Sequence, residues 1–389
     1  TYETYGMAAT AAPELATRMT HPRPSSSLCE GGGVDYFVSS ALFEAPGAQH
    51  KYAERLVLMP GLSFGFRRPL TPSEVPVRPA DIATGAWQNV RRQWLVGVTP
   101  GDDALEMVLN QHEVSYGYDW RIYSVPQTLY KLHPDFDRII AGVLAADPGA
   151  LVVALRGHHE QSWLDRFVGR IESAMRAQSG SSGGTSDDSV DMAMAQSVSQ
   201  RIICLPSLSR DDFLRLVGFS DVVLDTFPVG GGRSSLEVMA TGTPSVVLYP
   251  RTSILQLTSG MYAAMGMFVP FDRPPVSEQC GREVIDEGLV TFSETAYVSA
   301  AVDIATNTTR QAIIRSKILA RNEVLYTDGS RGVSQHPSSA PPCPCCRINT
   351  VVADWVRLLQ RVSAVERPHC ASKPKTRPPL GSPLRLGED

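Results

Sequence analysis

The hydrophobic positions in the middle of the chain alternate between two periods. Short, almost wholly apolar runs, such as LVVAL at 151–155 and DVVL at 221–224, predict strands that are buried on both faces. Between them lie segments with apolar residues at helical spacing. One is PDFDRIIAGVLAA at 134–146, which begins with Pro and acidic residues as helix N-termini do. Strands that alternate with helices predict a parallel sheet covered by helices on both faces.

This alternation runs from residue 116 to residue 330 and predicts one doubly wound, Rossmann-like α/β lobe. We expect strands at Trp120–Val125, Leu151–Leu155, Arg201–Leu205, Asp221–Leu224 and Pro244–Leu248. We expect helices at Pro134–Ala146, Ser162–Met175, Ser209–Val217, Arg233–Ala240 and Ser253–Met265. Ligands of such sheets bind at the carboxyl ends of the strands, so the residues that follow these strands are the first candidates for chemistry.

The rest of the chain is less regular. Residues 1–115 have strand-like runs at Val34–Ser39 and Arg55–Met59, poor helix signals between them and frequent Pro, and we interpret them as a partial N-terminal lobe. Four further segments are a mobile Ser/Gly/Asp-rich insertion at 178–199, a Pro/Ser/Cys-rich insertion at 331–347, a helix at 348–363 and a disordered tail at 364–389.

Composition excludes several classes of protein. The 389 residues suffice for two domains, and a formal net charge of −4 leaves no basic excess for binding nucleic acid. No apolar run approaches the roughly 18 residues that span a bilayer, so no membrane partner is expected. Thr1–Thr10 lacks the pattern of a signal peptide. Seven Cys, an odd number, do not suggest a disulfide framework, which favours a reducing compartment, cytoplasmic or nuclear.

The cysteine-rich insertion raises the question of a metal site. Its cysteines and nearby candidates are Cys343, Cys345, Cys346, His336, His369 and Cys370. Their spacing does not match a regular two-pair zinc site, so the reading as an irregular insertion is favoured and no metal is expected.

The most informative segment is DTFPVGGGRSSLEVMATGTP at 225–244. A strand ends, three glycines follow and a helix opens, which would let backbone N–H groups approach a diphosphate. The candidate diphosphate residues are Gly231, Gly232, Arg233, Ser234 and Ser235. Glu237, one turn into the helix, could accept hydrogen bonds from ribose hydroxyls. The alternative is an ordinary strand-to-helix turn with serine caps.

Two more segments follow strands of the same sheet. In YSVPQTLYKLHPDFD at 123–137, Lys131 could place a positive charge on a leaving diphosphate, and Gln127 could bond a phosphate or the base. In PSLSRDDFL at 206–214, Arg210 could hold base or phosphate and Phe213 could stack on a base. The alternatives are a solvated lysine and a core aromatic residue.

Together the segments PQTLYKLHPDFD (126–137), RIICLPSLSRDDFLRLVGFSDVVLDTFPVGGGRSSLEVMATGTPSVVLYP (201–250) and VDYFVSS (34–40) resemble the catalytic region of the O-GlcNAc transferase and SPINDLY family, including its bacterial protein N-glucosyltransferase relatives. The stretch AAPELATRMTHPRPSS at 11–26 is similar to the segment that precedes the last of these in that family. The resemblance covers about residues 7–65, 116–177 and 200–326.

The resemblance implies a fold of the GT-B type, with two Rossmann-like lobes of which the N-terminal one is partial. It implies a UDP-sugar donor, a protein or peptide acceptor and no cofactor or metal. Lys131 matches the family's diphosphate lysine, in the same motif as Gln127, and Gly231 to Ser235 match its diphosphate loop. Glu237 matches its ribose-binding acid, and Arg210 and Phe213 match positions that contact the uridine.

Departures from the family are also visible. The animal enzymes carry His-Thr-Thr where Gly232, Arg233 and Ser234 stand, and the glycines here look more like the N-glucosyltransferase branch. His21 is the histidine that remains in a matching segment of the N-terminal lobe and is the candidate proton acceptor, although a lone His is more often structural. A donor-binding scaffold without turnover, or an enzyme acting on a small-molecule acceptor, remain alternatives.

Overall fold

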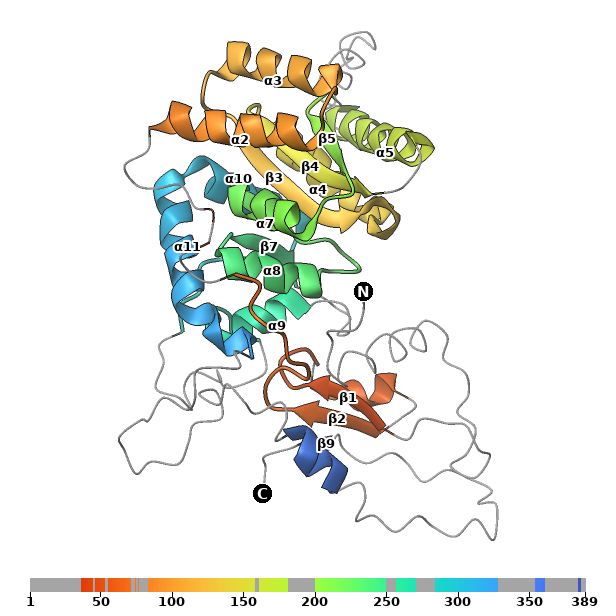
Figure 1. The fold of residues 1–389 in the computed structure, drawn as a ribbon. Coiled ribbons are helices and arrows are strands. Elements are labelled where there is room, and N and C mark those ends of the chain that lie inside the picture. The colour runs from red at the N-terminus through yellow and green to blue at the C-terminus, as the bar shows by residue number, and fades with distance from the viewer. Residues whose placement is uncertain are drawn as a thin grey trace.

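The computed structural model describes residues 36–44, 46–52, 55–70, 74, 76, 83–157, 161–180, 200–249, 257–270, 284–327, 354–360 and 384–385. These residues form a six-stranded and a three-stranded sheet, and all of the pairings in both sheets are parallel (Figure 1). His21, residues 331–347 and the cysteine cluster lie outside the described residues, as does most of the predicted insertion at 178–199.

The larger sheet has the strand order β5-β4-β3-β6-β7-β8. Its strands are β3 (Arg121–Thr128), β4 (Ala150–Gly157), β5 (Ile202–Pro206), β6 (Val222–Leu224), β7 (Ser245–Leu248) and β8 (Val290–Thr291). The order reverses direction between β3 and β6, so the chain builds outward from the centre of the sheet to one side and then to the other. This doubly wound arrangement confirms the predicted Rossmann-like lobe.

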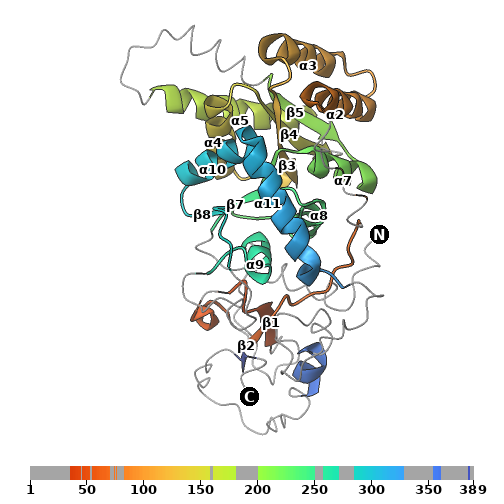
Figure 2. The same ribbon diagram turned by 90° about the vertical axis from the view of Figure 1, so that its left-hand side faces the viewer.

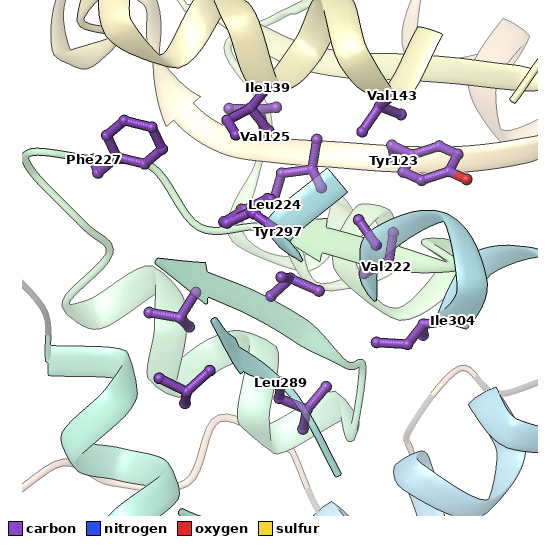
Figure 3. Close-up of a cluster of buried hydrophobic side chains, with 14 of the residues drawn as sticks. Tyr123, Val125, Ile139, Val143, Val222, Leu224, Phe227, Leu289, Tyr297 and Ile304 are labelled. Carbon is purple, nitrogen blue, oxygen red and sulfur yellow. The ribbon is translucent and has the colours of Figure 1, made fainter. Parts of the chain in front are cut away.

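Both faces of this sheet are buried, which explains the nearly continuous apolar runs of its strands. Tyr123 and Val125 of β3 pack on one face against α4 (Pro134–Ala146), α5 (Gln161–Gly180) and α10 (Glu294–Thr306). Figure 3 shows Ile139 and Val143 of α4 beside these two residues, and Tyr297 and Ile304 of α10 beside β6. Ile122, the residue before Tyr123, points to the opposite face, as the period of two requires.

The opposite face is covered by helices from two regions of the sequence. These helices are α2 (Thr84–Val98), α3 (Asp103–Tyr116), α7 (Arg210–Phe219) and α8 (Arg233–Thr241). Leu95 of α2 and Leu109 of α3 share one buried cluster with Ile122 and Leu151 of the sheet. Residues 84–116 therefore belong to the Rossmann-like lobe, and the predicted lobe boundary at residue 115 is too late by these two helices.

The smaller sheet has the order β1-β2-β9, with β1 (Tyr36–Ser40), β2 (Arg55–Met59) and β9 (Leu384–Arg385). A 3-10 turn, η1 (Ala48–Lys51), connects its first two strands. The predicted helix at 348–363 is present over residues 354–360, and its Leu358 and Trp355 pack on β2. Residues 384–385 lie in the predicted disordered tail, yet they form a short strand, because β2 offers them a free edge.

Four further helices follow in the described part of the chain. They are η3 (Leu129–Lys131), α9 (Leu257–Ala264), α11 (Thr308–Arg321) and η6 (Asn322–Leu325). Figure 2 shows α9 between the larger sheet and β1. Gly260 of α9 lies so close to Phe43, just after β1, that a Cβ on this glycine would come within 2.3 Å of the phenylalanine ring. The Thr327 N–H donates to the Phe66 carbonyl oxygen at 2.8 Å, which ties the chain after η6 to the segment after β2.

The other predicted strands and helices of residues 116–330 are confirmed with small shifts of their ends. Several of them extend beyond the predicted ends; β3, for example, continues to Thr128 and α5 to Gly180. Within the described residues, no helix is both long and apolar enough to cross a membrane.

The packing of α3 on the larger sheet can be tested directly. Leu109→Ala should lower the free energy of unfolding by about 2–5 kcal/mol, because Leu109 is buried against the sheet. Met107→Ala, on the exposed side of the same helix at 66% exposure, should change it by less than about 0.5 kcal/mol. Urea unfolding of the whole chain measures both. Equal effects of the two substitutions would contradict the assignment of α3 to this lobe.

Candidate functional site

The carboxyl ends of β3, β5 and β6 carry the residues that the sequence selects. Gln127 is near the end of β3 and Lys131 ends the turn η3 that follows. Arg210 begins α7, just after β5, and the glycine turn follows β6. Because the strands are parallel, all of these residues share one edge of the sheet.

The glycine turn leaves β6 and enters α8 with no room for a side chain at Gly231. A Cβ there would come within 2.2 Å of Ser235 Oγ and 3.0 Å of Ser234 Oγ. The Gly231 N–H donates to Asp225 Oδ1 at 2.8 Å, so this N–H group already has a partner within the protein. Gly231 therefore shapes the turn, and the remaining N–H groups at the start of α8 are the ones that can meet a ligand.

The start of α8 has no side-chain cap. Its N-cap is Gly232, whereas α7 begins with Ser209, whose hydroxyl accepts from the Asp212 N–H. The first N–H groups of a helix have no partner within the helix and carry the positive end of its dipole. An uncapped start at the carboxyl edge of the sheet is thus suited to an anion.

Gln127 connects the lysine to this helix start. Its side-chain nitrogen donates to Ser234 Oγ at 3.0 Å, and its side-chain oxygen accepts from Lys131 Nζ at 3.3 Å. Gln127 is buried, while Lys131 is exposed. The structure thus brings Lys131, Gln127 and Ser234 together on the same side of the sheet as the glycine turn.

Two arginines flank Glu237. Arg233 Nε donates to Glu237 Oε1 at 3.0 Å, and Arg210 Nε lies 4.0 Å from the same oxygen. Glu237 is buried, and burial raises the pKa of its carboxyl, which the two arginines partly offset. The candidate ribose acceptor is therefore already ion-paired, and a ribose hydroxyl would share this carboxylate with Arg233.

Phe213 is neither fully a core residue nor fully free to stack on a base. It is half-buried and packs against Val217 of its own helix, Val223 of β6 and Val238 of α8. Part of the ring therefore belongs to the core, and only the remaining part can contact a base. The exposed guanidinium of Arg210 lies one turn earlier on the same helix.

Asp225 is a site residue that the sequence analysis did not select. It is 6% exposed, at the end of β6, and bonds the glycine turn through Oδ1. Burial raises the pKa of this carboxyl from its ordinary 3.8 to about 6, against the lowering effect of hydrogen bonds from Gly231 and other neighbours. An acid that directly follows an all-apolar strand and precedes a glycine triplet is the signal that could have identified it.

The described residues contain no group of three or more His, Cys, Asp or Glu side chains that could hold a metal ion. His21, the candidate proton acceptor, lies outside the described residues. The described candidate site consists of hydrogen-bond donors and cations, with Glu237 and Asp225 as its acids.

Comparison with known proteins places the fold but not the family. No protein-family profile matches the chain, and no curated protein sequence matches it. A mutant of the O-GlcNAc transferase of Thermobaculum terrenum is similar in structure, with a TM-score of 0.53 and 17% identity, over 85% of this chain and 46% of that chain. This chain therefore spans about half the length of that protein.

More distant similarities are found to Anabaena HepE in complex with UDP and glucose and to a trehalose-phosphate synthase of Burkholderia vietnamiensis. The first has a TM-score of 0.43 and 13% identity over 85% of this chain and 64% of that chain. The second has a TM-score of 0.36 and 13% identity over 73% of this chain and 52% of that chain. Together with its parallel α/β architecture, the likeness to the Thermobaculum protein shows that the chain has a GT-B type fold.

The raised pKa of Asp225 predicts a specific dependence of stability on pH. Between pH 3.8 and about 6 the folded chain holds a proton on Asp225 that the unfolded chain has lost, so this group's contribution to stability falls as pH rises. The free energy of unfolding of the wild type minus that of Asp225→Asn should fall by about 2 kcal/mol between pH 4 and pH 7.5. Urea unfolding at each pH measures the difference, in which the other acids cancel. A difference that rises with pH would show that the carboxyl is stabilised as an anion.

Proposed function

We propose that this chain carries the donor site of a metal-independent glycosyltransferase. The enzyme moves a sugar, GlcNAc or glucose, from a UDP-sugar to a protein side chain. The observation that carries the proposal is the contact of Lys131 with Gln127 and of Gln127 with Ser234, which joins a flexible cation to an uncapped helix start in a GT-B type fold. Both groups are suited to a diphosphate, and together they could bind one nucleoside diphosphate.

The chemistry of sugar transfer explains why these groups are useful there. When the bond between the anomeric carbon and the diphosphate oxygen breaks, negative charge grows on the leaving UDP. The ammonium of Lys131 and the N–H groups at the start of α8 would lie against this charge, and they would stabilise it more in the transition state than in the bound donor. No metal ion is needed for this step, since the protein supplies the positive charge.

The nucleoside is assigned to the residues beside the diphosphate. Glu237 would accept from the ribose hydroxyls, and Arg210 with the exposed part of Phe213 would contact the uracil. Supporting this assignment, Arg210 and Glu237 lie within 4.0 Å of each other, so one nucleoside could reach both.

The protein acceptor is supported by the sequence resemblance and by the name of the similar Thermobaculum protein, an O-GlcNAc transferase. Release of UDP from UDP-GlcNAc and UDP-glucose, with and without a mixture of Ser-, Thr- and Asn-containing peptides, tests the proposal. Peptide-dependent release supports it. Binding of UDP without any release would instead favour a donor-binding scaffold, and release that depends on free sugars but not on peptides would favour a small-molecule acceptor.

Lys131→Ala should lower kcat by about 100-fold or more, because the lost charge acts mostly on the departing diphosphate. The dissociation constant for the UDP-sugar should rise by less than about tenfold, since the helix start and the nucleoside contacts remain. Steady-state rates and calorimetric titration measure the two effects. Lys317→Ala, which removes a lysine of α11 that is paired with Glu287, is the matched control and should leave both values near those of the wild type. An unchanged kcat for Lys131→Ala would remove this lysine from the mechanism.

The metal-independent step predicts that chelation has no effect. Dialysis against EDTA, followed by assay in the same buffer, should leave the rate of UDP release within about twofold of the untreated rate. The reason is that Lys131 and the start of α8 stabilise the charge on the leaving diphosphate in place of a metal ion. Activity that disappears with EDTA and returns with Mg²⁺ or Mn²⁺ would contradict this part of the proposal.

A further inference from the structure

Asp225 lies beneath the glycine turn with its backbone held on two sides. Its N–H donates to the Val246 carbonyl of β7 at 3.0 Å, and its carbonyl oxygen accepts from the Tyr297 hydroxyl of α10 at 3.0 Å. The carboxylate oxygen Oδ1 then accepts from Gly231 N at 2.8 Å. The side chain of Asp225 thus connects the end of β6, where its backbone is hydrogen-bonded to β7 and α10, to Gly231 in the turn before α8.

Thr258 of α9 lies beside the same carboxyl group. Oδ2 has no hydrogen-bond partner of ordinary geometry among the described residues, although the Thr258 hydroxyl lies close enough to lower the pKa of the carboxyl. That hydroxyl donates to Ser235 Oγ at 2.7 Å. Thr258 is fully buried, so α9 supports the first turn of α8 from the same side as Asp225.

These contacts determine where the helix start points. Gly231 has no space to move toward Ser235, and its N–H is held by Asp225. Ser234, on the outer side, meets Gln127 and through it Lys131. If the turn shifted away from Asp225, the first N–H groups of α8 and Ser234 would lose their alignment with Lys131, and a shift of about 1 Å is costly at such a site.

We propose that Asp225, supported by Thr258, is a positioning residue of the donor site: it holds the glycine turn so that the start of α8 and Lys131 meet the same diphosphate. This inference rests on the proposed function for its ligand. Asp225 itself is buried beneath the turn and acts on the ligand through Gly231 and Ser235.

The chain offers a matched control for a buried acid. Asp147, 2% exposed, accepts from Gly149 N at 3.0 Å and from the Tyr123 hydroxyl at 2.7 Å. It therefore makes the same carboxylate-to-glycine bond, but it precedes β4 and lies at the amino edge of the sheet. Its loss should affect stability without affecting the donor site.

The test uses the whole chain and titrates UDP calorimetrically at a temperature at which each variant is folded by circular dichroism. Asp225→Ala should raise the dissociation constant of UDP by about tenfold or more, because Gly231 N loses a charged acceptor. Asp225→Asn, whose amide oxygen can still accept from Gly231, should recover most of this loss. Thr258→Val should give a smaller rise, and Asp147→Ala a change of less than about threefold. In the transferase assay the KM for the donor should rise more than kcat falls.

A second measurement separates this inference from the proposed function. Amide hydrogen exchange at Gly231 to Ser235, without any ligand, should speed up by about tenfold in Asp225→Ala relative to Asp147→Ala. If the wild type does not bind UDP but the turn loosens in this way, the donor assignment fails and the positioning of the turn by Asp225 stands.

The inference is wrong if Asp225→Ala binds UDP like the wild type, or if its exchange rates match those of Asp147→Ala. It is also wrong if Asp147→Ala weakens UDP binding as strongly, since general destabilisation would then explain the effect. Should Asp225→Ala not fold, the same comparison is made with Thr258→Val, whose side chain fills a similar volume, and unchanged binding and exchange in that variant would overturn the role of this support.

Discussion

Burial of the six-stranded sheet on both faces is the constraint on which the rest of the structure depends. Neighbouring residues such as Ile122 and Tyr123 enter opposite cores, so neither face of the sheet can hold polar chemistry. Polar side chains can gather only where the strands end. Because all pairings are parallel, one edge collects every strand-to-helix connection, and the candidate site is made from three of them.

At that edge the structure holds the glycine turn from two sides. Asp225 binds the Gly231 N–H from within the core, and Gln127 binds Ser234 from the outer side. A turn with three consecutive glycines would otherwise adopt many conformations, since glycine restricts its own backbone least. The tight contacts of Gly231 show that the sequence uses glycine here for close approach of neighbouring atoms.

The charges of the site are arranged asymmetrically. Lys131 and Arg210 are exposed, whereas the acids Glu237 and Asp225 are buried and have pKa values that burial raises. An anion that approaches from solvent therefore meets the cations first. This arrangement fits the proposed UDP-sugar, whose charge lies on the diphosphate in its middle and whose ribose hydroxyls could reach a deeper acid such as Glu237.

The sequence by itself determined the alternation of strands and helices, the edge at which chemistry can occur and the residues that share it, because periodicity and glycine placement are local properties of the chain. Only the tertiary structure decided which sheet each helix covers. The apolar faces of the helices in residues 84–116 could pack on any apolar surface. Their position on the larger sheet is seen only in the contacts of Leu95 and Leu109 with its strands. Three other features also depend on contacts between distant segments, which a local sequence pattern does not reveal. They are the pairing of residues 384–385 with β2, the partial burial of Phe213 and the position of Asp225 beneath the turn.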